Sequence, residues 1–229
     1  MRIAVLVSSG GSAFIAAWKI LSEYSSNQHE YIVITDRKCE IEKFCSENML
    51  KYKRIEYKNR NQFSLDSYKY IQRNGGIDFA FLYFLRILTK ELFQNYPCLN
   101  IHPSLLPAFK GLNSVEQFLQ SGAKFIGATL HLVDEGVDTG SIVAQVQVPI
   151  KPKITLEQAQ KISFLQKVYL TLVGIELLEM QCITFNERYL GFEWVKTLPY
   201  SPHANPVLQN QRFLEGFINL QKQENYQIM

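Results

Sequence analysis

The chain has 229 residues, of which 47% are hydrophobic and 20% are charged, a composition that supports one ordinary folded domain and excludes wholesale disorder. Its net charge of +3 argues against the dense basic face of a duplex-binding protein, and no apolar run reaches the ~20 residues that cross a bilayer, so we expect no nucleic-acid and no membrane partner. Four scattered cysteines without a CxxC or Cys/His cluster argue against a metal site or disulfide scaffold and favour a cytoplasmic location.

Hydrophobic runs alternate with amphipathic stretches through the first half of the chain. Strands are predicted at 2–8, 30–35, 52–57, 77–84 and 98–101, and helices at 13–24, 40–49 and 62–73. Alternating strands and helices, with strands that are almost continuously apolar, are typical of parallel sheets covered on both faces. The pattern therefore predicts an α/β fold, a Rossmann-like, open, mostly parallel twisted sheet with helices on both faces.

The second half continues with a helix at 115–120 and two apolar runs, 125–133 and 141–150, around the turn 134–140. A capping box at Thr155 to Gln158 opens the longest helical pattern, which runs to about Met180. From Asn205 the chain turns polar, with one amphipathic stretch. We therefore predict a catalytic domain over 1–195 and an extension of unknown role over 196–229, which docks on the domain, pairs with a partner or frays.

The strand that ends in Asn100-Ile101-His102, followed by a proline-bounded loop, is the most informative segment. Ligands of open α/β sheets bind beyond the carboxyl ends of the strands, and strand residues two apart project to the same side. Asn100 can donate a hydrogen bond to a developing oxyanion, and histidine titrates near neutrality. His102 is either a catalytic group or a histidine that caps the edge of the core.

Three further features of the sequence are candidates for the same site or for its support. Asp138, in Gly136-Val137-Asp138-Thr139-Gly140, is either a turn residue or a carboxylate that orients His102. His131 lies within a predicted strand, where we expect a hydrogen-bonded structural role. The loop Ser8-Ser9-Gly10-Gly11-Ser12 joins a strand to a helix, where a phosphate can rest on the helix N-terminus, although it matches no dinucleotide or P-loop motif.

Together these residues resemble the glycinamide ribonucleotide formyltransferase family. The resemblance covers residues 2 to about 180. Its most specific segment is Asn100 to Gly111 (NIHPSLLPAFKG), followed by Gly127 to Val133 and Gly136 to Gly140, and Phe84 to Leu88 resembles the family's folate-contacting segment.

The resemblance implies the formyltransferase fold and transfer of a formyl group from 10-formyltetrahydrofolate, a cosubstrate, to a primary amine, most readily that of 5-phosphoribosylglycinamide in purine biosynthesis. Asn100 and His102 would stabilise the tetrahedral oxyanion, and Asp138 would hold His102 and raise its pKa. The folate would lie against Phe84, Leu85, Arg86, Leu88, Gly136 and Val137. The phosphorylated acceptor would contact Gly10, Gly11, Ser12, Ala13 and Gln166.

Four positions depart from the family pattern, three of them on the acceptor side and the fourth, Tyr83, in the folate segment. Ala13 replaces an asparagine, Asn113 a histidine, Gln166 the acceptor-contacting glutamate, and Tyr83 a glycine. An alternative hypothesis is therefore that the chain is a formyltransferase that acts on another amine, such as an amino-sugar nucleotide. A catalytically silent folate-binding relative and a formate-releasing hydrolase are the other two hypotheses. A monomer or a homodimer is expected.

Overall fold

The computed structural model describes residues 1–25 and 27–228, and in them one sheet of eight strands organises the fold. Five strands are parallel, in the order β3-β2-β1-β4-β5. They are β1 (Arg2–Val7), β2 (Glu30–Thr35), β3 (Lys51–Arg54), β4 (Phe79–Tyr83) and β5 (Cys98–His102). Three antiparallel strands extend the sheet beyond β5, namely β6 (Phe125–Leu132), β7 (Ile142–Pro149) and β10 (Ala204–Asn205). The predicted mostly parallel α/β sheet is confirmed.

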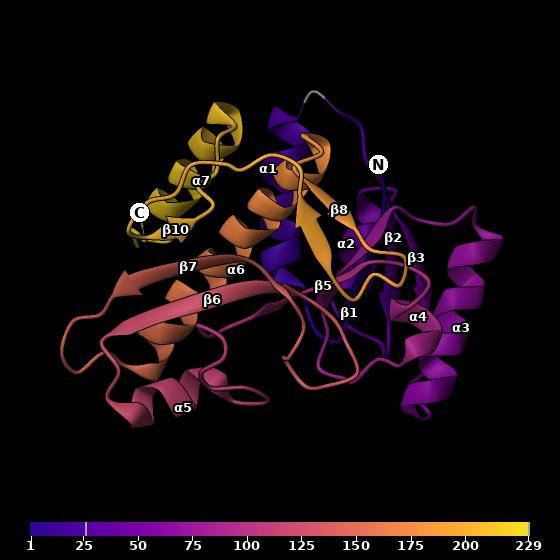
Figure 1. Cartoon of the computed structure of the whole chain (residues 1–229), viewed down its shortest axis with the longest axis horizontal. Coiled ribbons are helices and arrows are strands. Elements are labelled where there is room, and N and C mark those ends of the chain that lie inside the picture. Colours follow the sequence, from indigo (N-terminus) through magenta and orange to yellow (C-terminus); the bar gives the residue numbers. More distant parts are fainter. Residues whose placement is uncertain (26, 229) are drawn as a thin grey trace.

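Helices cover both faces of this sheet (Figure 1). One face carries α1 (Ser12–Tyr24), α2 (Ile41–Glu47), α5 (Ser114–Ser121), α6 (Leu156–Glu179) and α7 (Gln211–Gln223), and the other carries α3 (Arg60–Arg73) and α4 (Lys90–Phe93). Strand β1 shows how the sequence produces the two layers. Its residues Ile3, Val5 and Val7 join the core with α1 and α6, and the alternate residues Ala4 and Leu6 join the core with α3 and α4.

The strand order places a crevice at the carboxyl ends of the central strands. The chain adds β2 and β3 on one side of β1 and then returns to add β4 and β5 on the other side. Connections that diverge in this way leave space beyond the carboxyl ends of the two strands between which the order reverses. Here these strands are β1 and β4, and the glycine loop and residues 84–88 follow them directly.

The C-terminal extension docks on the rest of the chain. Strand β10 pairs with β7, and α7 contributes the buried side chains of Phe213 and Phe217 to the main core. The buried carboxylate of Glu176 on α6 accepts hydrogen bonds from the backbone N–H groups of Gln209 and Asn210, just before α7 begins. Residues 196–228 therefore share one core with the preceding domain, while their role stays open.

The cap of α7 gives a stability prediction. The Asn210 side chain accepts hydrogen bonds from the backbone N–H groups of Arg212 and Phe213, at 3.1 and 3.2 Å. We expect Asn210→Ala to lower the free energy of unfolding by about 1 kcal/mol, because an N-cap side chain satisfies amides that the helix leaves unpaired. Urea unfolding checks this value, and an unchanged midpoint would mean that the docked helix does not unfold with the core.

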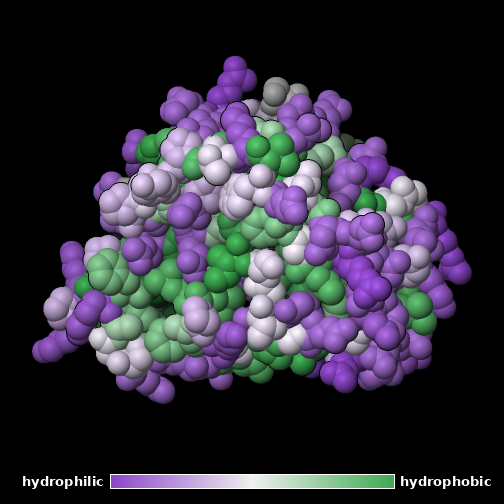
Figure 2. All heavy atoms as spheres, in the orientation of Figure 1, coloured by the Kyte–Doolittle hydropathy of each residue, from purple (hydrophilic) through white to green (hydrophobic). Residues whose placement is uncertain are grey.

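Four short elements escape sequence prediction. They are α4, β10 and the hairpin of β8 (Ile183–Phe185) and β9 (Phe192–Trp194), each of two to four residues. Elements of this length hold too few residues for a recurring apolar period. In the described residues, no helix is both long and apolar enough to cross a membrane. Figure 2 shows apolar residues gathered over the β6 and β7 side of this view and mainly hydrophilic ones over α3.

Candidate active site

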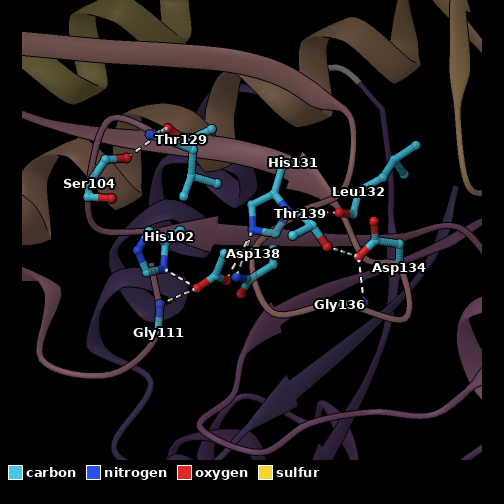
Figure 3. A network of polar contacts seen from close by, with 12 residues as sticks. His102, Ser104, Gly111, Thr129, His131, Leu132, Asp134, Gly136, Asp138 and Thr139 are labelled. Atoms are coloured by element: carbon cyan, nitrogen blue, oxygen red, sulfur yellow. Dashed lines mark hydrogen bonds and ion pairs between the residues drawn. The ribbon is translucent and has the colours of Figure 1, made fainter. Parts of the chain in front are cut away.

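Asp138, His102 and Asn100 converge at the carboxyl end of β5. His102 ends this strand, and its Nδ1 lies 3.2 Å from the Asp138 Oδ2. Asp138 comes from the loop between β6 and β7, and Figure 3 shows its carboxylate between His102 and His131. Asn100 projects to the same side of β5 as His102 and lies opposite His131 in the register of β5 and β6. The structure thus brings the three sequence-predicted catalytic residues to one place.

His131 orients Asn100 as well as Asp138. Its Nδ1 lies 2.7 Å from the Leu132 carbonyl oxygen, which can only accept, so Nδ1 donates. In the neutral imidazole the Nε2 then accepts, and the Asn100 Nδ2 lies 3.1 Å from it. Asn100 has a second N–H, which is left for a ligand. The hydrogen-bonded histidine expected at this position is present, and its link to the Asn100 amide was missed because the register of β5 against β6 cannot be read from the sequence.

Each ring nitrogen of His102 faces an oxygen acceptor. Its Nε2 lies 2.8 Å from the Phe109 carbonyl oxygen, and its Nδ1 faces Asp138. Burial lowers the pKa of His102, and the Phe109 carbonyl and the Asp138 carboxylate oppose this without cancelling it. The expected upward effect of Asp138 is therefore present, but the net shift is downward because desolvation of the imidazolium is larger. Burial thus favours the neutral imidazole, while the two oxygen acceptors favour its cation.

The loop that carries Asp138 is held in a strained and crowded conformation. Asp138 has a φ of 51°, a left-handed conformation that aspartate tolerates better than most residues. Its Oδ2 also accepts a hydrogen bond from the Gly111 N–H at 2.8 Å. Burial would raise the pKa of Asp138, but the nearby His131 imidazole, the hydrogen bond from the Gly111 N–H and the charge of His102 together lower it. A Cβ at Gly140 would overlap the Leu132 carbonyl oxygen, so only glycine lets this loop close on β6.

A cavity of about 830 Å³ opens beside the Asp138 network. All six residues expected to bind folate line it, namely Phe84, Leu85, Arg86, Leu88, Gly136 and Val137. Three contacts fix their segment after β4. The Phe84 ring stacks on Phe63 with centroids 4.9 Å apart, and the Arg86 guanidinium lies 4.8 Å from the centre of the Tyr57 ring, with its Nε 3.3 Å from Asp36.

The acceptor-side residues divide between the cavity wall and the core. Gly11, Ser12 and Ala13 line the cavity, whereas among the described residues Gly10 and Gln166 lie outside its wall. Gln166 has no exposed surface, and its Nε2 donates to the Ile126 carbonyl oxygen at 3.0 Å. The Gln166 side chain therefore faces β6 in place of the cavity, because each helical residue turns by 100°, and its contact with the acceptor stays a prediction.

Lys167, which follows Gln166 on α6, lies on the cavity wall. Lys167 lines the cavity together with Gln160, Ser163 and Phe164, which share its face of α6. Tyr83 and Asn113, two other positions that depart from the family pattern, line it as well. No group of three or more His, Cys, Asp or Glu side chains in residues 1–25 and 27–228 is arranged to hold a metal ion.

The protonation of His102 can be measured directly. We expect its imidazole to titrate below 6.5 in nuclear magnetic resonance spectra, because burial disfavours the cation. In Asp138→Asn the midpoint should fall further, since the carboxylate that favours the cation is gone. A midpoint above 6.5 in the unaltered protein, or an upward move in the variant, would contradict this electrostatic account.

Comparison with known proteins places this site in a family. The model of the formyl transferase family matches residues 1–171. A chloroplastic phosphoribosylglycinamide formyltransferase of Arabidopsis thaliana is 34% identical over 187 residues, which are 76% of this chain and 64% of that protein. The trifunctional purine biosynthetic protein adenosine-3 of Homo sapiens is 38% identical over 66% of this chain and 15% of its own length.

A solved structure agrees over almost its whole chain. Glycinamide ribonucleotide transformylase 1 of Symbiobacterium toebii is 28% identical, with a TM-score of 0.75 over 82% of this chain and 92% of its own. The matched region thus spans less than two thirds of the two curated relatives and nearly all of this solved one. The sequence match over residues 1–171 and the shared architecture lead to one conclusion, which is that this chain belongs to the formyl transferase family.

Proposed function

We propose that this chain transfers the formyl group of 10-formyltetrahydrofolate to the primary amine of 5-phosphoribosylglycinamide, a step of purine biosynthesis. The observation that carries the proposal is the convergence of Asn100, His102 and Asp138 on the wall of one large cavity. The names of the relatives, which are phosphoribosylglycinamide formyltransferases and purine biosynthetic proteins, support the same reaction. We also propose a cytoplasmic location, in keeping with four cysteines that form no disulfide.

The cavity suits a folate and a nucleotide together. Its volume of about 830 Å³ lies within the range of sites that hold sizeable ligands. We assign the pterin of the donor to the wall of Phe84 to Leu88 and Gly136 to Val137, which combines apolar side chains with backbone groups. We assign the phosphate of the acceptor to Gly11, Ser12 and Ala13, at the N-terminus of α1, where backbone N–H groups favour an anion.

The reaction needs a base and an oxyanion donor, and the trio supplies both. The acceptor amine attacks the formyl carbon, a C–N bond forms, and the carbonyl oxygen becomes an oxyanion. The free N–H of Asn100 stabilises this oxyanion, and His102 takes the proton that the amine loses on its Nε2, which exchanges the Phe109 carbonyl oxygen for the amine. The bond between the formyl carbon and N10 of the folate then breaks, and the proton passes to N10. Asp138 stabilises the imidazolium that exists in between.

A rate measurement tests the proposal. Purified protein with 10-formyltetrahydrofolate should release tetrahydrofolate only when glycinamide ribonucleotide is added. Release with an amino-sugar nucleotide instead would identify another acceptor, and release of formate without any amine would identify a hydrolase. Folate binding without turnover of any kind would contradict the proposal and favour a silent relative.

A further inference from the structure

Lys167 is a cation without a counter-ion on the cavity wall. The fixed positive charges among the described lining residues are Arg86 and Lys167. Arg86 is paired with Asp36. Lys167 is half-buried, and within residues 1–25 and 27–228 its ammonium group has no hydrogen bond and no ion pair. Lysine is rarely buried unless paired, because desolvating an ammonium group costs free energy.

The structure holds the turn that carries Lys167 in a fixed position. The Thr171 hydroxyl donates to the Lys167 carbonyl oxygen at 2.7 Å, and the Tyr83 hydroxyl bonds to the Thr171 hydroxyl. Tyr83 ends β4, and its ring lies 6.1 Å from that of Phe14 in the first turn of α1. The turn of α6 that bears Lys167 is therefore linked both to the sheet and to the start of α1.

A second positive feature belongs to the same cavity. Helix α1, of 13 residues, begins at Ser12 and follows Gly11, whose φ is 66°. No side chain caps this end of the helix, and its first turn has no acidic residue. The backbone N–H groups of that turn therefore lack intrahelical partners and carry a partial positive charge. Ser12 and Ala13 line the cavity together with Lys167. A phosphate, with two negative charges and several acceptor oxygens, complements both features.

We propose that Lys167 binds the phosphate of the acceptor and thereby selects a phosphorylated amine over its unphosphorylated counterpart. This inference rests on the proposed function and adds Lys167, which the family resemblance did not indicate. The ammonium group supplies the charge that Ala13, with its methyl side chain, cannot supply from α1. Lys167 is a specificity residue and takes no part in proton transfer.

Binding measurements test the inference without requiring turnover. Lys167→Met is compared with Lys161→Met, an equivalent change on the same helix outside this cavity, where the ammonium group lies 6.0 Å from the Tyr226 ring centre. Calorimetry then gives the Kd of glycinamide ribonucleotide and of glycinamide ribonucleoside, which lacks the phosphate. A melting curve confirms that each variant is folded, and Lys167→Arg provides a form that keeps the charge.

We expect Lys167→Met to weaken ribonucleotide binding about 10- to 100-fold, the effect of a lost charge-assisted hydrogen bond. Ribonucleoside binding should stay within about twofold, Lys161→Met should change neither, and Lys167→Arg should retain most of the affinity. Unchanged ribonucleotide binding, equal losses for both compounds, or a loss of folate affinity in place of acceptor affinity would overturn the inference. The proposed function fails separately, if the ribonucleotide binds through Lys167 but is never formylated.

Discussion

His102→Ala is expected to lower kcat by about 10²- to 10⁴-fold, the usual contribution of a positioned base. The KM for the folate donor should stay within a few-fold, because the residues that we assign to the pterin lie on other segments. The measurement is the initial rate of tetrahydrofolate release at saturating donor and acceptor.

His203→Ala provides the matched control, because His203 is exposed and lies outside the Asp138 network. It should leave kcat unchanged. If both variants kept the rate of the unaltered protein, His102 would be a histidine that only caps the edge of the core.

Asp138→Asn is expected to lower kcat by about 10²-fold or more while the affinity for the donor changes little. Asparagine cannot balance the charge of the His102 imidazolium, so the proton that leaves the amine is held less well. The variant should also move the acid limb of the pH profile of kcat/KM to lower pH, since the His102 pKa falls. If Asp138 had only a structural role, Asp138→Asn would slow the reaction without moving the acid limb of the pH profile.

Most of the fold could be predicted because its signals are local, whereas the grouping of Asp138 with Asn100 and His102 followed from the family resemblance. Continuous apolar runs such as Glu30–Thr35 indicate buried parallel strands, and the predicted range matches β2. Asn100 and His102 are two apart at a strand end, so their common orientation follows from the pleat alone. The loop Gly136 to Gly140 stands out by its composition, and it brings Asp138 to His102.

The features that escaped prediction depend on contacts between distant segments. His131 joins Asn100 only through the register of β5 against β6. On α6, a difference of one position decides which side chain lies on the cavity wall, because Gln166 faces the core and Lys167 faces the cavity. The downward shift of the His102 pKa depends on burial, a property of the assembled site that the residue types alone do not reveal.

We expect His102 and Asp138 to act as one unit on the transferred formyl group. The direct test is kcat for tetrahydrofolate release in His102→Ala, in Asp138→Asn and in the double variant. Residues that act together have strongly non-additive effects, so we predict that the double variant is about as slow as His102→Ala alone. A double variant slowed by the full product of the two single effects would show that the two residues act independently and would contradict the account.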